Sequence, residues 1–258
     1  MCLILLAHDA HPRYRLVVAA NRDEFYERPT APADWWDDAP GVLAGRDLRG
    51  GGTWMGITRR GRFAAVTNYR DAAPPSPEAP SRGHLVGGFL AGDGAPGAYL
   101  RALEPRAEEY AGFNLLVGDG SGLWYYGNRG GEARPLGPGV YGLSNALLDT
   151  PWPKVERGRA ALREAVSSGD DVDPEALFRI LWDAEPAPDL LLPETGVGIE
   201  RERMLSSSFI RSPEYGTRAS TVLLVGRDGR VRFVERSVVP GRGDWTEAAY
   251  GFEADEEG

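Results

Sequence analysis

The stretch "CLILLAH" at residues 2–8 decides the fold of this chain. A short apolar run of this kind is typical of a buried β-strand. A second apolar segment, "YRLVVAAN" at residues 14–21, follows after a proline-containing turn at residues 11–13. The two segments predict an antiparallel hairpin at the start of the chain, and the other elements have to pack around it.

The same signals predict further strands and short helices along the chain. Hairpins are predicted for 53–58 with 62–68, for 112–118 with 123–128 and for 217–226 with 230–239; single strands for 139–146 and 206–212; short helical turns for 84–92 and 96–110.

Stronger helical signals concentrate between residues 150 and 184. Thr150-Pro151 is typical of an N-cap followed by proline at the first helical position, and Asp173-Pro174 repeats this arrangement. Apolar residues at helical spacing follow both dipeptides, so two helices are predicted here.

Strands therefore occupy both ends of the sequence and helices lie mainly in its middle. This order favours an α+β fold, a four-layer αββα sandwich with antiparallel sheets, over alternating βαβ units. Residues 1–250 are expected to form a single domain, and the acidic residues 251–258 a disordered tail. The leucine-rich loop at 185–198 is expected either to fold onto the core or to act as a mobile lid over an apolar pocket.

Composition and charge exclude several classes of protein. The chain has 258 residues, of which 42% are hydrophobic, a formal net charge of −9 and a pI near 5.0. Because neutralising phosphates requires basic patches, no nucleic-acid partner is expected. No apolar run approaches the roughly 18 to 20 residues that span a bilayer, and no secretory signal is recognisable. We therefore expect a cytoplasmic protein without a membrane span.

Cys2 is the only cysteine in the sequence. A single thiol excludes internal disulfides and multi-cysteine metal sites, and the three histidines lack metal-ligand spacing, so no metal site is expected. Removal of Met1 would place this thiol and a free α-amine in one residue. Since such an amine has a pKa of about 7.7–8.0, it can take the thiol proton near neutral pH. The alternative is that Cys2 is only a small buried apolar residue.

Four polar residues, Asn21 to Glu24, directly follow the second strand. If the first two strands pair, these side chains lie beside Cys2. Arg22 close to a thiol would lower the thiol pKa and favour the thiolate. Asp23 could hold the arginine or the α-ammonium in place. An ordinary capped turn would account for the acidic residues but not for Arg22.

Several longer motifs resemble the NRDE family, also called the Transport and Golgi organisation protein 2 family. They are "MC" at the start, "AANRDEFYERP" (19–29), "GGTWMGI" (51–57), "YGLSNALLDTPWPK" (141–154) and "YGTRASTVLLV" (215–225). The resemblance runs from Met1 to about Trp245. It implies an αββα fold similar to that of the N-terminal-nucleophile hydrolases, in particular the branch with penicillin V acylase and bile-salt hydrolase. In that branch a cysteine exposed by methionine removal attacks an amide.

The resemblance also implies catalytic residues. Cys2 matches the nucleophile, and Arg22 with Asp23 resembles the arginine and aspartate of the second strand, although the hydrolases space these two apart. Asn145 resembles the asparagine whose side-chain amide helps to form the oxyanion hole. Arg218 matches a late arginine near the nucleophile.

Asn68 and Asn21 are candidate binding residues, Asn68 as an additional hydrogen-bond donor. For Asn145 and Asn68, a turn or strand-end side chain bonded to the backbone explains the residues equally well. Lys154 is the only lysine, and nothing in "PWPKVERG" (151–158) indicates a chemical role for it.

Two functions are consistent with these residues. The first is hydrolysis of a non-peptide carbon–nitrogen bond by Cys2, which requires no cofactor. The second is a non-catalytic carrier or chaperone, because animal members of the family have been linked to haem trafficking and to lipid or acyl-CoA handling. On that hypothesis the same pocket would hold haem or an acyl lipid. Both predict a small-molecule ligand with an apolar part, and neither fixes the oligomeric state. The co-occurrence of Cys2 with the charged candidates favours the hydrolase.

Overall fold

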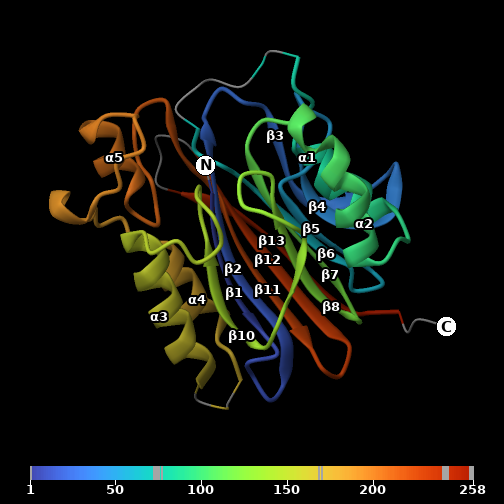
Figure 1. The fold of residues 1–258 in the computed structure, drawn as a ribbon. Coiled ribbons are helices and arrows are strands. Elements are labelled where there is room, and N and C mark those ends of the chain that lie inside the picture. The colour runs from blue at the N-terminus through green and yellow to red at the C-terminus, as the bar shows by residue number, and fades with distance from the viewer. Residues whose placement is uncertain are drawn as a thin grey trace.

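Two antiparallel sheets lie face to face at the centre of the computed structural model, which describes residues 2–71, 76, 78–167, 169, 171–239 and 244–255 (Figure 1). Within these residues the first sheet has six strands in the order β10 (Gly139–Leu143), β1 (Cys2–His8), β2 (Tyr14–Phe25), β11 (Tyr215–Gly226), β12 (Arg230–Val238) and β13 (Trp245–Glu253). The second has seven in the order β3 (Thr30–Trp36), β4 (Ala39–Asp47), β5 (Met55–Thr58), β6 (Phe63–Asn68), β7 (Phe113–Asp119), β8 (Gly122–Gly127) and β9 (Arg134–Leu136).

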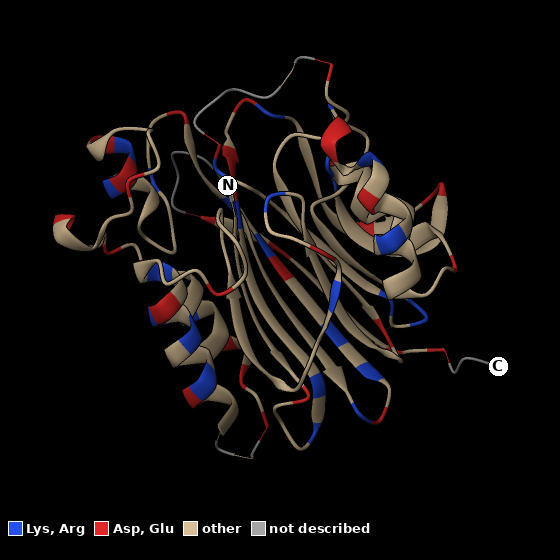
Figure 2. Cartoon of the chain, viewed as in Figure 1, with Lys and Arg blue, Asp and Glu red and all other residues tan. Residues whose placement is uncertain are grey.

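Helices cover the outer faces of both sheets (Figure 1). The first sheet is covered by α3 (Pro153–Ser167) and α4 (Pro174–Leu181), and the second by α1 (Gly83–Ala91) and α2 (Pro96–Leu103). Shorter elements are the 3-10 helices η1 (Glu104–Glu109) and η2 (Asp189–Leu191) and the helix α5 (Ile199–Leu205). In Figure 2 the strands are largely uncharged, while the charged residues colour mainly helices and loops.

Three sets of apolar side chains fill the spaces between these four layers. Successive side chains of a strand point to opposite faces, so β1 contributes to two of the sets. Ile4 and Leu6 pack between the two sheets, whereas Leu3 and Leu5 pack against α3 and α4. A third set, which includes Phe89, lies between the second sheet and α1 and α2. The predicted αββα sandwich is confirmed.

The four predicted hairpins form with antiparallel pairing: β1 with β2, β5 with β6, β7 with β8, and β11 with β12. The strand predicted at 139–146 forms β10, which pairs with β1. Among the described helices, none is long and apolar enough to cross a membrane.

The first of the two predicted helix starts is wrong by two residues. The helix α3 begins at Pro153, and the Thr150 hydroxyl donates to the Leu147 carbonyl at 2.8 Å instead of capping the helix. The second start is confirmed, because the Asp173 side chain accepts from the Glu175 N–H at 2.9 Å.

Residues 206–212 were predicted as a strand, and this prediction is wrong. Only an isolated bridge between Arg211 and Gly216 forms here. Ser206 instead donates to the Arg203 carbonyl at 2.7 Å and accepts from the Ala187 N–H at 2.8 Å. Serine hydroxyls that bond to nearby backbone compete with strand formation in this way.

Two further predictions need correction. The predicted tail does not begin at residue 251, because β13 continues to Glu253 by pairing with β12; residues 256–258 of that tail lie outside the described residues. In the loop at 185–198, Leu190 is 97% exposed and Leu191 59% exposed. These two leucines therefore do not fold onto the core, and the lid alternative stays a prediction.

The cap of α4 gives a direct test of local stability. We expect Asp173→Ala to lower the free energy of unfolding by about 1 kcal/mol and the Tm by about 2–4 °C, because the Glu175 N–H loses its acceptor. Asp173→Asn keeps the acceptor and removes only the exposed ion pair with Arg179, so thermal unfolding should change much less. Equal losses in the two variants would assign the effect to charge instead of capping.

Candidate functional site

The pairing of β1 with β2 brings the charged candidates to the thiol. Cys2 lies opposite Arg22 in this pair. On its other side β2 pairs with β11, where Thr217 lies opposite Asp23. The register shifts directly after Thr217, so Arg218 falls at an irregularity of the strand, and such bulges re-aim a side chain. Cys2, Arg22, Asp23 and Arg218 meet at one end of the first sheet.

A cavity of about 640 Å³ opens beside this strand end. Of the candidates from the sequence, Cys2, Arg22, Asp23, Asn68 and Arg218 line it, and among the described lining residues Asn21 and Asn145 are absent. Its charged lining residues are Arg22, Arg28, Arg46, Arg49, Arg82 and Arg218 with Asp23, Glu24, Asp47 and Glu235. The described wall thus carries more basic than acidic groups, although the whole chain has a net charge of −9.

Apolar side chains, including Trp54, Val66 and Ala111, share the rest of this wall with hydroxyl residues such as Thr53 and Ser81. The cavity therefore combines guanidinium groups with an apolar surface. Such a site fits a ligand that has both an anionic and an apolar part.

Burial dominates the chemistry of the thiol. Cys2 is 8% exposed, and this burial raises the pKa of its thiol. The Asp23 carboxylate adds to the rise, while Arg22 opposes it. The sequence predicted that Arg22 would favour the thiolate, but desolvation outweighs the arginine. The thiol is therefore protonated at neutral pH and needs a base before it can attack.

Asp23 is buried more deeply, at 1% exposure. Its Oδ1 accepts a hydrogen bond from Thr217 Oγ1 at 2.7 Å. Burial raises the pKa of this carboxyl, and among the groups that oppose the rise Lys154 has the largest effect. Lys154, which sequence analysis left without a role, lies in the first turn of α3 and is 1% exposed.

The Asn21 side chain is bonded within the fold and is absent from the described cavity lining, so its role as a binding residue stays a prediction. Its Nδ2 donates to the Leu181 carbonyl at 2.7 Å and to the Ser208 carbonyl at 2.8 Å, and its Oδ1 accepts from Ser220 Oγ at 2.7 Å. It is fully buried on the helix side of β2. These bonds connect the end of α4 and the 206–210 segment to the sheet.

The two other asparagines are neighbours. Asn145 is 1% exposed, and its Nδ2 donates to the Asn68 carbonyl at 2.9 Å. The adjacent Ser144 hydroxyl donates to the Cys2 carbonyl at 3.0 Å, so this segment is attached to the start of β1. Asn145 therefore has the backbone bond that the sequence offered as an alternative, and it keeps a second amide hydrogen. The Asn68 side chain lines the cavity.

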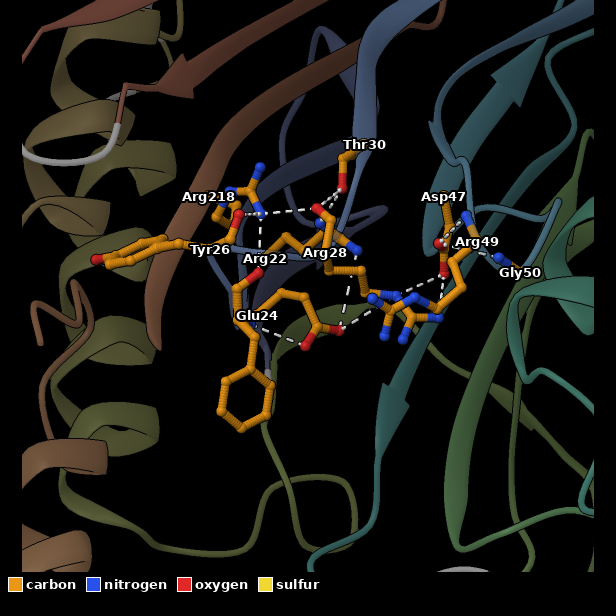
Figure 3. Close-up of polar contacts among 10 residues, drawn as sticks. Arg22, Glu24, Tyr26, Arg28, Thr30, Asp47, Arg49, Gly50 and Arg218 are labelled. Carbon is orange, nitrogen blue, oxygen red and sulfur yellow. Dashed lines mark hydrogen bonds and ion pairs between the residues drawn. The ribbon is translucent and has the colours of Figure 1, made fainter. Parts of the chain in front are cut away.

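Arginines that line the cavity hold the turn after β2 (Figure 3). Arg218 Nη1 donates to the carbonyls of Phe25, Tyr26 and Arg28 at 2.9, 3.2 and 3.0 Å. Arg28 Nη2 in turn lies 2.6 Å from Asp47 Oδ2 in the second sheet. The bond from Arg28 attaches the turn after β2 to the end of β4 in the second sheet.

Arg22 is held in the same network (Figure 3). Its Nη1 donates to Thr30 Oγ1 at 3.1 Å, and its Nη2 lies 4.0 Å from Glu24 Oε2. The Arg22 guanidinium is thus fixed on the same face of the first sheet as the Cys2 thiol of the neighbouring strand β1.

Arg82 and Glu235 are among the lining residues that the sequence analysis missed. Arg82 precedes α1 and donates from Nη1 to the Gly112 carbonyl at 2.9 Å; burial lowers the pKa of its guanidinium, and Cys2 opposes this. Glu235 of β12 accepts from the Ala33 N–H at 2.8 Å, and burial raises the pKa of its carboxyl. Both lie far from Cys2 in sequence, and only the packing of the two sheets brings them to the cavity.

Comparisons with known proteins agree with this architecture. The model of the family described as Transport and Golgi organisation 2 matches residues 1–240. A Transport and Golgi organization protein 2 homolog from Bos taurus is 42% identical, covering 93% of this chain and 94% of its own length, and the Homo sapiens homolog is 40% identical with the same coverage. The Drosophila melanogaster Transport and Golgi organization protein 2 is 27% identical over 95% of each chain.

Among solved structures, the Caenorhabditis elegans N-acylethanolamine-hydrolyzing acid amidase ortholog superposes with a TM-score of 0.50. The superposition covers 86% of this chain and 92% of the nematode protein at 10% sequence identity. A likeness at this identity shows a shared fold of the N-terminal-nucleophile hydrolase type and nothing of the activity.

The role assigned to Asn21 predicts a loss of stability without a loss of thiol reactivity. We expect Asn21→Ala to lower the free energy of unfolding in urea by about 3 kcal/mol, because two buried carbonyls lose their donor. Asn68→Ala, at the cavity wall, should change it by less than about 0.5 kcal/mol. Alkylation of Cys2 in folded Asn21→Ala protein should proceed at the unaltered rate. A stable Asn21→Ala protein would instead favour Asn21 as a binding residue.

Proposed function

Because the chain belongs to the Transport and Golgi organisation 2 family, we propose that it hydrolyses a non-peptide amide bond with Cys2 as nucleophile, after removal of Met1. One observation carries the proposal: the register of β1 against β2 sets the lone thiol beside Arg22 and Asp23 on the wall of a cavity. A carrier needs a cavity but has no need of a thiol with an adjacent base.

The α-amine of processed Cys2 is the base in the proposed mechanism. It takes the thiol proton, and the sulfur attacks the amide carbon to form a tetrahedral oxyanion. The carbon–nitrogen bond then breaks, the leaving amine takes the proton from the α-ammonium, and a thioester remains on Cys2. A water molecule gives a proton to the α-amine and attacks the thioester, which releases the carboxylic acid and restores the thiol.

Amide hydrogens of Asn145 and Asn68 are the proposed oxyanion donors. The Asn68 side chain lines the cavity with Cys2, and Asn145 keeps one amide hydrogen beyond its bond to the Asn68 carbonyl. Donors of this kind act because they are already oriented where the negative charge develops.

The lining also restricts the substrate. Guanidinium groups such as Arg49 and Arg82 favour a carboxylate or phosphate, and Trp54 and Val66 supply apolar contact. The proposed substrate is therefore an amide with an apolar acyl part and an anionic group. The same lining favours the carrier hypothesis, in which haem or an acyl lipid would be held without turnover, so the discriminating property is reaction at the thiol.

The first test is the intact mass of the natively expressed protein before and after iodoacetamide treatment at neutral pH. We expect loss of Met1 and a single carbamidomethyl group on Cys2, followed by release of amine from an anionic N-acyl amide. Cys2→Ala should lower this release by at least about a thousand-fold, since the nucleophile is absent. Retained Met1, an inert thiol, or equal amine release by wild type and Cys2→Ala would contradict the proposal, and haem titration of the Soret band would then test the carrier.

The oxyanion donors give a second test. We expect Asn145→Ala to lower kcat by about a hundred- to a thousand-fold with little change in KM, because the lost bond forms only in the transition state. Glu78, an exposed residue outside the cavity lining, provides the matched control as Glu78→Ala, which should retain full activity. An unchanged kcat in folded Asn145→Ala protein would leave the oxyanion to Asn68 or to backbone donors.

A further inference from the structure

Lys154 is the only lysine in a chain that has 29 basic residues, and it is buried. It lies on the same face of α3 as Gly158, Leu162 and Val166, at four-residue spacing, and this face packs against β1. Its Nζ has no hydrogen-bond partner within the part of the chain that the structure describes. A buried ammonium without such a partner is costly, so its electrostatic surroundings have to explain its presence.

Four titratable groups act on the Lys154 amine. They are Asp23 of β2, Cys2 of β1, Glu202 of α5, and Arg70, which follows β6. Arg70 Nη1 lies 2.6 Å from Glu202 Oε2, and both side chains are buried. The remaining carboxylate that favours a charged Lys154 is Asp23.

The groups that act on the Asp23 carboxyl indicate the same pairing of Asp23 with Lys154. Burial raises the pKa of the Asp23 carboxyl, and Lys154 is the strongest of the groups that hold it down. Tyr215 of β11 also interacts electrostatically with Asp23 and Cys2, and burial raises the pKa of its phenol, so it adds no charge at neutral pH. Arg22 lies on the opposite face of β2 and has a smaller effect on Asp23.

We propose that Lys154 is a positioning residue of the Cys2 site, whose buried amine supplies the positive charge that keeps Asp23 ionised. Without Lys154, Asp23 could stay ionised only by drawing its counter-charge from the α-ammonium of Cys2, and that amine could not then accept the thiol proton. With Lys154 in place, the α-amine is free to lose its proton near neutral pH. The sulfur, the α-amine and the Lys154–Asp23 pair then act as one electrostatic unit.

This inference rests on the proposed function in taking Cys2 as the reactive group and Met1 as removed, and its tests need no substrate. The sole lysine makes the first test direct: protein grown with lysine labelled with ¹³C at Cε gives one lysine NMR signal. We expect that signal to titrate near pH 8, since burial lowers the pKa of Lys154 from 10.5 to about 8. In Asp23→Asn protein the midpoint should fall by about one further pH unit, because the stabilising anion is lost.

The second test is the pH dependence of Cys2 alkylation by iodoacetamide. In Lys154→Met protein we expect the midpoint of the alkylation rate profile to lie about one pH unit higher than in wild type. Alkylation at pH 7 should therefore be roughly ten-fold slower. The sign follows because loss of a cation raises the pKa of both the α-amine and the thiol. Lys154→Arg keeps the positive charge, so its alkylation profile should lie close to that of wild type. Arg163→Met, an exposed site on the same helix, should leave the profile unchanged.

Each outcome decides the inference. A lysine signal that titrates near 10.5 and does not respond to Asp23→Asn overturns it, as does a Lys154→Met profile identical to wild type. If Lys154→Met does not fold, the titration of wild-type lysine before and after carbamidomethylation of Cys2 replaces it, and an unmoved midpoint there counts against the inference. Absence of amide hydrolysis with a normal Lys154 titration would refute the proposed function alone.

Discussion

The register between β1 and β2 is the constraint on which the site depends. Because side chains alternate along a strand, a slip of one residue would turn Cys2 to the other face of the sheet and place its apolar neighbours wrongly. The core fixes this register: Leu3 and Leu5 must meet the helices while Ile4 and Leu6 meet the second sheet. The hydrophobic pattern that folds the sandwich thus also sets the thiol opposite Arg22.

The charged groups of the site lie inside the protein, where unpaired charges are costly. The structure meets this cost by pairing them across segments: Arg28 of the turn after β2 with Asp47 of β4, and Arg70 of the segment after β6 with Glu202 of α5. Each pair fixes a segment at the end of the sandwich. The same desolvation raises the pKa of the Cys2 thiol, so the environment that orders the site also makes an internal base necessary.

Much of the fold could be predicted from the sequence because the hairpins have strong apolar runs and tight turns. The strands β3 and β4 were missed, since "TAPADWW" (30–36) and "APGVLAGRD" (39–47) contain proline, glycine and aspartate, which are depleted in strands. Pairing with β5 and packing under α1 override these weak propensities. The edge strand β13 was missed because its side chains are mostly exposed, so its sequence has no strong run of apolar residues to mark a strand.

The candidate site was predictable where it follows from strand pairing, as for Cys2, Arg22 and Asp23, and not where it depends on how the layers pack, as for Arg82. Lys154 is a different case, because its signal was present in the sequence. A lysine four residues before Gly158 and eight before Leu162 lies on the buried stripe of a helix, and every other basic position in the chain is arginine. A single lysine at a buried position of such a chain indicates that charge alone, which arginine would also supply, does not fully account for the residue. An amine can lose its proton near neutral pH when it is desolvated, whereas a guanidinium stays charged, so the choice of residue indicates a site where the charge is adjustable.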